Sequence, residues 1–166
     1  GGFAPGSDDV IYGGNVSNWI KAAKAIKARA HLHLGQYGEA LSNAKASFES
    51  AADNMSYTFG TTQQAGWWRF NDGRTGDIEF HPTLRAMMTD LNDTDRLGVW
   101  DQTFITSHPY MKADYRQDYV SYREIQFIIA ECLKRTNGSS AEMETAYLNG
   151  IKASFIDAGL SEAEFT

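Results

Sequence analysis

The stretch from Ala28 to Phe48 constrains the fold most, because two helical patterns meet within it. After the junction, apolar residues recur with the spacing of one helix face: Tyr37, Ala40, Leu41, Ala44 and Phe48. Before the junction, the matching apolar stripe consists of Trp19, Ala23, Ile26 and Ala30. Gly35 marks the junction, because a residue without Cβ can adopt the left-handed backbone conformation that ends a helix. The stretch therefore predicts a helical hairpin.

Small side chains at the predicted helix contact allow the two helices to approach closely: Ala28, Ala30, Ala40 and Ala44. We expect the first helix from about Ser17 to Leu34, with Asn15 or Ser17 as its N-cap. The second helix is expected from about Tyr37 to Ala52. The Gly-x-Tyr-x-x-Ala-Leu arrangement that begins at Gly35 resembles a tetratricopeptide-type repeat.

A second helical hairpin is predicted near the end of the chain. Ser121 with Glu124 and Ser139 with Glu142 have the spacing of capping boxes, which satisfy free backbone N–H groups of a first turn. The apolar positions of the first of these helices are Tyr122, Ile125, Ile128, Ile129, Cys132 and Leu133, and those of the second are Met143, Ala146, Tyr147, Gly150 and Ile151. The first of these helices is expected to end at Asn137-Gly138 and the second at Gly159, because such residues commonly end helices. A third box, at Ser161 and Glu164, suggests that a further helix begins here and that the chain is a piece of a longer protein.

The two hairpins are related by an internal repeat, since Lys45-Ala-Ser-Phe48 recurs as Lys152-Ala-Ser-Phe155. We interpret the chain as mainly α, with tetratricopeptide-like helical hairpins and a long loop-rich insertion. The expected organisation is one domain over residues 1–166: a Gly-rich lead-in pinned by Ile11 and Tyr12, a first hairpin at 17–52, a loop-rich aromatic insertion at 53–118, and a second hairpin with the start of a further helix at 119–166.

Residues 53–118 have a different composition, in which Gly, Thr, Asn and Asp alternate with many aromatic residues. Long loops are expected here, with one short helix at Pro82–Leu91, where Pro82 fits the first turn. The aromatic residues are Tyr57, Phe59, Trp67, Trp68, Phe70, Phe80, Trp100, Phe104, Tyr110 and Tyr115. A loop region of this length in a compact domain is usually functional when it is ordered.

Net charge is −6, and the 15 basic residues are dispersed along the chain. This distribution argues against a nucleic-acid partner and fits an uncharged or cationic one better. No apolar run approaches the ~20 residues that span a bilayer. The single cysteine, Cys132, falls in an apolar helical stripe and is interpreted as a buried thiol.

The pair Trp67-Trp68 is the sharpest local signal, and it is followed by Arg69, Asn71 and Asp72. In a locally extended stretch one indole would face the core and the other would face outward. An exposed indole stacks on the C–H face of a sugar ring, while the three polar side chains supply donors and acceptors for hydroxyls. These five residues are the candidate ligand-binding set. The alternative is that both indoles pack under the loop.

Other chemistry is less well supported by the sequence. Asn71–Glu79 and Asp90–Asp95 place several oxygen ligands together, as calcium needs, but turns and helix caps explain the same residues and no cofactor is predicted. His31 and His33 face apart on a helix and cannot chelate one ion. No sequence motif of a hydrolase, nucleotide-binding or redox site occurs, so we predict no catalytic residues and no metal ligands. A glycosidase carboxylate pair remains open, because the sequence does not give the separation of its carboxylates.

Four blocks in order resemble the SusD/RagB family of Bacteroidetes outer-membrane lipoproteins. Residues Asp9–Leu34 carry an Ile-Tyr-Gly-Gly-Asn loop into a helix, and Tyr119–Glu131 is similar to the family's Tyr-x-Glu-x-x-x-Ile-x-Ala-Glu helix. Tyr147–Ser154 is near to Tyr-x-x-Gly-Ile-x-Ala-Ser. Leu91–Leu97 resembles the family's Asn-Asp-Pro-Arg-Leu without its proline.

This resemblance implies tetratricopeptide-like helices with a loop-rich cap, anchored by lipid to the outer leaflet of the cell outer membrane. It also implies capture of glycans or other small nutrients for a TonB-dependent (SusC-like) transporter, with a lipidated N-terminal portion absent here. The first hypothesis is therefore a non-enzymatic, SusD-like nutrient-binding protein. The second is a tetratricopeptide-like protein–protein adaptor that binds no carbohydrate. Exposure of Trp67 or Trp68 beside polar side chains would favour the first.

Overall fold

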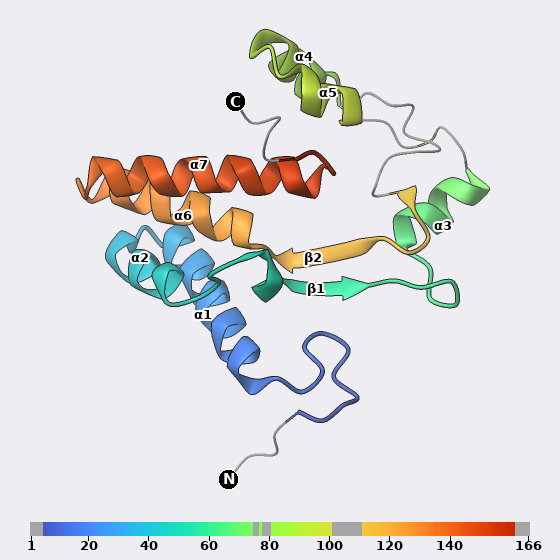
Figure 1. The fold of residues 1–166 in the computed structure, drawn as a ribbon, viewed down its shortest axis with the longest axis horizontal. Helices are drawn as coiled ribbons and strands as arrows, with labels where there is room; N and C mark the ends of the chain where they lie inside the picture. The colour runs from blue at the N-terminus through green and yellow to red at the C-terminus, as the bar shows by residue number, and fades with distance from the viewer. Residues whose placement is uncertain (1–4, 75–76, 78–80, 101–110, 162–166) are drawn as a thin grey trace. The chain divides into compact units, whose positions relative to one another are not determined.

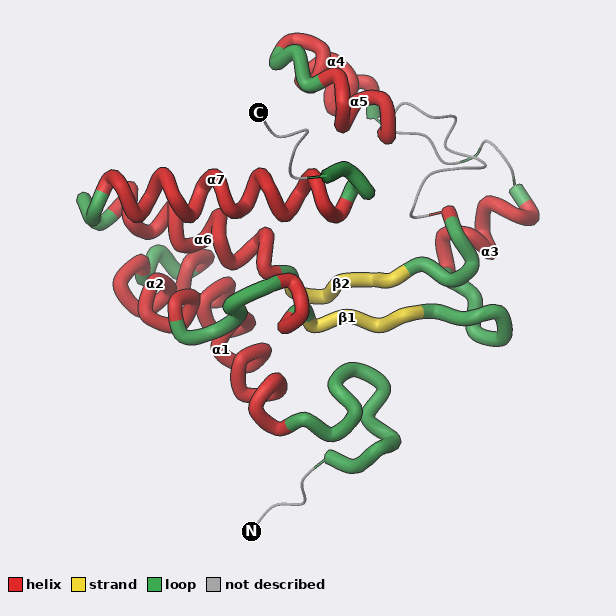
Figure 2. The backbone as a smooth tube through the Cα atoms, viewed as in Figure 1, coloured by secondary structure: helices red, strands yellow, loops and turns green. Residues whose placement is uncertain are grey.

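The structure is a computed structural model that describes residues 5–74, 77, 81–100 and 111–161, without the side chains of residues 99 and 100. Its helices are α1 (Val16–His33), α2 (Tyr37–Lys45), α3 (Gly66–Gly73), α4 (Pro82–Asp90), α5 (Thr94–Trp100), α6 (Tyr122–Arg135) and α7 (Ser140–Asp157), with a 3-10 turn η1 (Ala51–Asp53) (Figure 1). Strands β1 (Met55–Thr58) and β2 (Arg116–Val120) lie side by side as a pair (Figure 2) and run in opposite directions (Figure 1). The fold is mainly helical, as predicted.

The chain divides into two compact units. Unit 1 consists of residues 1–57 and 118–154, and unit 2 consists of residues 58–117 and 155–166. Unit 1 contains the two predicted hairpins, α1–α2 and α6–α7, whereas α3, α4 and α5 belong to unit 2.

The first hairpin forms where the sequence predicts it. The side chain of Asn15 accepts a hydrogen bond from the backbone N–H of Asn18 and caps α1. Gly35 has φ +71° and ends the helix in the left-handed conformation, which a residue with a Cβ adopts only at a cost. The second helix is shorter than predicted, because α2 ends at Lys45 and the Ser47 hydroxyl donates to the backbone carbonyl of Ala44 at 2.6 Å.

The buried face of α1 differs from the predicted stripe. Ala22, Ala25 and Ala28 are fully buried, whereas Ala23 and Ala30 are exposed and Ile26 is 45% exposed. Apolar residues occur around most of the α1 circumference, so periodicity alone does not select a face. Helices that approach closely place their smallest side chains at the contact, and Ala40 and Ala44 of α2 do the same.

Helix α6 supplies the large side chains of the core. Its apolar face is buried as predicted, with Ile125, Ile128, Ile129, Cys132 and Leu133 all packed in one cluster with the alanines of α1 and α2. Burial raises the pKa of the Cys132 thiol, which fits a structural thiol.

The serines of the first two predicted capping boxes cap their helices. Ser121 and Ser139 accept hydrogen bonds from the backbone N–H groups of Glu124 and Glu142 at 3.2 and 3.3 Å. The third predicted box, which ends at Glu164, lies outside the described residues.

The region from 53 to 118 contains more regular structure than predicted. Helix α4 forms at the expected place, but β1, β2, α3 and α5 were not expected there. Polar side chains hold the unit 1 end of the strand pair, since Asp118 accepts hydrogen bonds from Ser56 Oγ at 2.6 Å and Asn54 Nδ2 at 3.2 Å. Asn54 in turn accepts from the backbone N–H of Tyr122 at 2.7 Å. The strands are short, and buried and exposed residues do not alternate cleanly along them. The sequence pattern therefore does not predict them.

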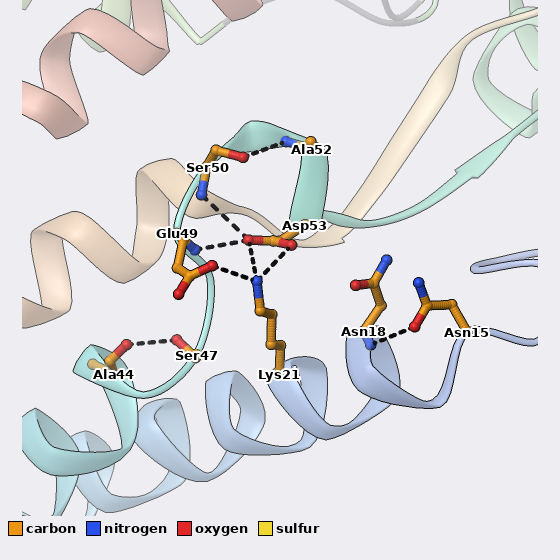
Figure 3. A network of polar contacts seen from close by, with 9 residues as sticks. All are labelled: Asn15, Asn18, Lys21, Ala44, Ser47, Glu49, Ser50, Ala52 and Asp53. Carbon is orange, nitrogen blue, oxygen red and sulfur yellow. Dashed lines mark hydrogen bonds and ion pairs between the residues drawn. The ribbon is translucent and has the colours of Figure 1, made fainter.

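Asp53 connects the lead-in, α1 and η1 through its buried carboxylate and its backbone carbonyl. Lys21 Nζ lies 3.1 Å from both oxygens of Asp53 and 2.7 Å from Glu49 (Figure 3). The backbone N–H groups of Glu49 and Ser50 donate to the same carboxylate at 2.8 and 3.3 Å. The hydroxyl of Tyr12 donates to the backbone carbonyl of Asp53 at 2.9 Å, which pins the lead-in as predicted.

The first prediction concerns the core. Because Ile125 is fully buried, we expect Ile125→Ala to lower the free energy of unfolding by about 2–5 kcal/mol. The matched control is Ile20→Ala on α1, where the side chain is 54% exposed and the change should stay within about 0.5 kcal/mol. Urea unfolding followed by circular dichroism measures both. Equal effects of the two substitutions would contradict this assignment of the core.

The second prediction concerns pH. Burial by itself would raise the pKa of Asp53, but the hydrogen bonds from Glu49, Lys21 and Ser50 outweigh it and hold the pKa below its usual range. The ionised carboxylate therefore stabilises the fold above its unfolded pKa of about 4, and this stabilisation is lost as the pH falls through the lower folded pKa. We expect wild type to be more stable than Asp53→Asn at neutral pH, with the difference shrinking in acid.

Urea unfolding at about pH 7 and about pH 3 tests this expectation. The control is Asp8→Asn, which makes the same charge change at an exposed side chain of the lead-in. If the stability of Asp53→Asn followed pH in parallel with that of wild type, the carboxylate network would not have the stabilising role described.

Candidate functional site

Helix α3 carries all five residues of the predicted binding set, and its helical form corrects the expectation of an extended loop. In an extended segment Trp67 and Trp68 would point opposite ways, whereas in a helix they diverge by about 100°. Trp67 instead shares a helix face with Phe70, three residues later. Arg69 and Asp72 lie about 200° and about 140° around the axis from Trp67.

A pocket of about 500 Å³ opens beside this face of α3 within unit 2. It is lined by four aromatic rings together with small and polar side chains: Phe59, Ala65, Gly66, Trp67, Phe70, Asp77, Tyr115 and Gln117. The Trp67 side chain is 53% exposed and that of Phe70 is 43% exposed. Large aromatic surfaces at the mouth of a pocket are available to a ligand.

Backbone hydrogen bonds hold the walls of this pocket together. The N–H of Phe59 donates to the carbonyl of Tyr115 at 3.0 Å, which continues the strand pairing into unit 2. The N–H of Ala65 donates to the carbonyl of Ala113 at 2.9 Å, and Ala65 is buried at the residue before α3 begins. The start of α3 is therefore tied to the segment that precedes β2.

Arg74 contacts two of the residues that line the pocket, Phe70 and Asp77. Its guanidinium carbon lies 5.2 Å from the centroid of the Phe70 ring, in a cation–π arrangement. The same guanidinium pairs with Asp77, with 2.5 Å between Nη2 and Oδ2. The positive charge of Arg74 is thus already engaged by a ring and a carboxylate.

The structure separates the predicted binding residues from one another. Trp67 lines the pocket; Trp68 is half-buried, Arg69 and Asp72 are exposed, and Asn71 is buried, and these four are not among the residues that line it. The residues that the sequence set missed are the aromatic partners Phe59, Phe70 and Tyr115 and the polar pair Asp77 and Gln117. The separation of three residues between Trp67 and Phe70 is the sequence feature that indicates a shared helix face.

The acidic segments considered for calcium do not gather into a metal site where they are described. Asp77 pairs with Arg74, and Asp93 pairs with Arg96 at the start of α5. No group of three or more His, Cys, Asp or Glu side chains that could hold a metal ion occurs in the described part of the chain. The histidines take local roles: His31 lies 2.5 Å from Gln36, and His81 caps α4.

A second hollow, of about 560 Å³, lies between α6 and α7 in unit 1. It is lined by Phe127, Ala130, Glu131, Ser140, Met143, Glu144 and Tyr147. Tyr147 is 53% exposed and meets the ring of Phe127 edge to face at 5.9 Å. This is an apolar groove with an acidic rim, the kind of surface to which an amphipathic helix binds.

The fold and the aromatic pocket define the class of protein first: a mainly helical chain with helical hairpins in unit 1 and a pocket lined by aromatic rings in unit 2. A family model described as starch-binding and associating with the outer membrane matches residues 2–103, more than half of the chain. The chain belongs to this SusD-like family, whose members are binding proteins and not enzymes.

Solved structures support the fold. A SusD/RagB family protein from Bacteroides thetaiotaomicron matches with a TM-score of 0.72 at 22% identity, over 93% of this chain and 40% of that one. A chitin-binding protein matches with a TM-score of 0.74 at 17% identity, over 91% of this chain and 42% of that one. The chain thus spans about two fifths of the length of these two proteins. A search of curated proteins gave no match.

No helix within the described residues is long and apolar enough to cross a bilayer. The family description places its members in association with the outer membrane.

Proposed function

We propose that this chain binds a glycan, without catalysing a reaction on it, in the aromatic pocket beside α3. The observation that carries the proposal is Trp67, a half-exposed indole at the mouth of a pocket that also holds three other aromatic rings. Sugar rings present C–H groups on their faces, and flat aromatic rings stack on these faces. Asp77 and Gln117 offer hydrogen-bonding groups to sugar hydroxyls at the same wall.

The family membership supports a glycan over other small nutrients, since its description names starch. The chitin-binding protein of similar fold supports the same chemical class, although at 17% identity it does not identify the sugar. We therefore propose a glycan ligand without naming its monosaccharide.

We further propose that the protein works at the outer leaflet of the outer membrane with a TonB-dependent transporter of the SusC type. Two observations support this: the family description refers to association with the outer membrane, and the four sequence blocks match SusD/RagB lipoproteins. A lipid anchor on a preceding segment would attach the protein to the membrane. The helical hairpins of unit 1 would serve as the scaffold and the transporter-facing surface.

The second candidate is a protein–protein adaptor. The groove between α6 and α7 favours it, because Phe127, Met143 and Tyr147 form an apolar floor and Glu131 and Glu144 form the rim. The two candidates use different units of the chain and can be separated by substitution.

The third prediction separates them. We expect Trp67→Ala to reduce glycan affinity about tenfold or more, because a central aromatic side chain commonly dominates a binding surface. Tyr147→Ala is the matched control, since its ring is equally exposed but lies on α7. A glycan array followed by calorimetric titration of the glycans that bind measures both variants.

The outcomes distinguish the hypotheses. Glycan binding that survives in Trp67→Ala would remove the pocket from the proposal. If wild type binds no glycan, and a helical peptide partner loses affinity only for Tyr147→Ala, the adaptor becomes the better description.

A further inference from the structure

We infer that the pocket beside α3 selects uncharged glycans and rejects those that carry carboxylate or sulfate groups, and that Asp77 is the residue that sets this selectivity. The inference rests on the proposed function, because it assigns the ligand class of the same pocket. It follows from how the charges around the pocket are arranged.

The one charged group in the described lining is a carboxylate, and it is paired with an arginine that does not itself line the pocket. Among the described residues that line it, Asp77 is the only charged one, and its side chain is 42% exposed. The other described lining residues are apolar or neutral, so no cation in the lining would balance an incoming anion. Two like charges brought close together disfavour binding, most strongly where water is partly excluded.

The nearest cation is already engaged. Arg74 stacks over the Phe70 ring at 5.2 Å and pairs with Asp77 at 2.5 Å. A guanidinium fork that is open toward the ligand favours binding of a uronate or a sulfate. Arg74 would have to leave both Phe70 and Asp77 to provide it.

Two further arginines near the pocket face elsewhere. Arg69 lies on α3 about 200° around the axis from Trp67. Arg116 stands between Tyr115 and Gln117, which both line the pocket, and alternate residues of an extended segment point to opposite sides. The residues that the structure leaves undescribed include no Lys and no Arg.

The whole of unit 2 adds to the negative field. Its sequence contains eleven Asp and Glu residues against six Lys and Arg, whereas unit 1 contains ten against nine. Nearly all of the net charge of −6 is thus concentrated in the unit that holds the pocket. This negative field repels an anionic polymer as it approaches the pocket, whereas it exerts no net force on the charge of an uncharged glycan.

The fourth prediction tests the role of Asp77. The substitution Asp77→Asn removes the carboxylate, keeps the size of the side chain and releases Arg74 from its ion pair. We expect it to raise affinity for oligogalacturonate and for carboxymethyl starch about threefold or more in about 10 mM salt, with a smaller gain in about 150 mM salt. The ratio of the affinity for these anionic glycans to the affinity for uncharged starch oligosaccharides should therefore rise about threefold or more, whatever change the uncharged glycans themselves show.

Asp90→Asn is the control. It makes the same change in net charge at an exposed position of α4 that does not line the pocket. A gain for anionic glycans in Asp77→Asn that is absent from Asp90→Asn supports a local role of the carboxylate. Equal gains in the two variants overturn the assignment of selectivity to Asp77.

The wild-type protein is tested on an array that holds both uncharged and anionic glycans. Binding of uncharged glycans only is the expected result. Preferential binding of uronates or sulfated glycans overturns this inference and leaves the proposed glycan binding intact. Failure of both wild type and Asp77→Asn to bind any glycan overturns the proposed function and the inference together.

Discussion

Unit 1 depends on one buried carboxylate, that of Asp53. It receives hydrogen bonds from Lys21 on α1 and from the backbone N–H groups of Glu49 and Ser50 (Figure 3). The backbone carbonyl of Asp53 accepts a further hydrogen bond from the Tyr12 hydroxyl in the lead-in. A buried charge is stable only when several partners satisfy it, so these segments can adopt few alternative positions. Because Asp53 ends η1 and β1 begins two residues later, the same carboxylate also fixes where the strand starts.

The strand pair has different supports in its two parts. In unit 1, Asp118 binds Ser56 and Asn54, which fixes the pairing of β1 with β2 by side-chain hydrogen bonds. In unit 2, the bonds from Phe59 to Tyr115 and from Ala65 to Ala113 are between backbone groups, and Phe59 and Tyr115 both line the pocket. Backbone pairing thus holds in place the segments that carry these two aromatic rings.

Much of the helical scaffold could be predicted from sequence, because its signals are local. Gly35, Asn15 and Ser121 act through their own backbone neighbourhood, and α6 has one strongly apolar face. The buried face of α1 could not be predicted, since it depends on which side chains let the neighbouring helices approach. The same limit applies to the repeated Lys-Ala-Ser-Phe, which leaves the helix after Lys45 but stays within α7 from Lys152 to Phe155. In the pocket, Trp67 was identified from its chemistry, but Phe59 and Tyr115 lie far along the chain and are brought together only by strand pairing.

The chemistry of the pocket agrees with membership of a family of binding proteins. Hydrolysis of a glycosidic bond by the common mechanism needs two carboxyl groups on opposite sides of that bond, separated by roughly 5–10 Å. Among the described lining residues Asp77 supplies one carboxylate, and it is paired with Arg74, which also lies over the Phe70 ring. Aromatic surface dominates the remaining walls, and such surface stabilises a bound sugar without favouring a charged transition state over the ground state. A glycan bound here, as proposed, would therefore be left chemically unchanged.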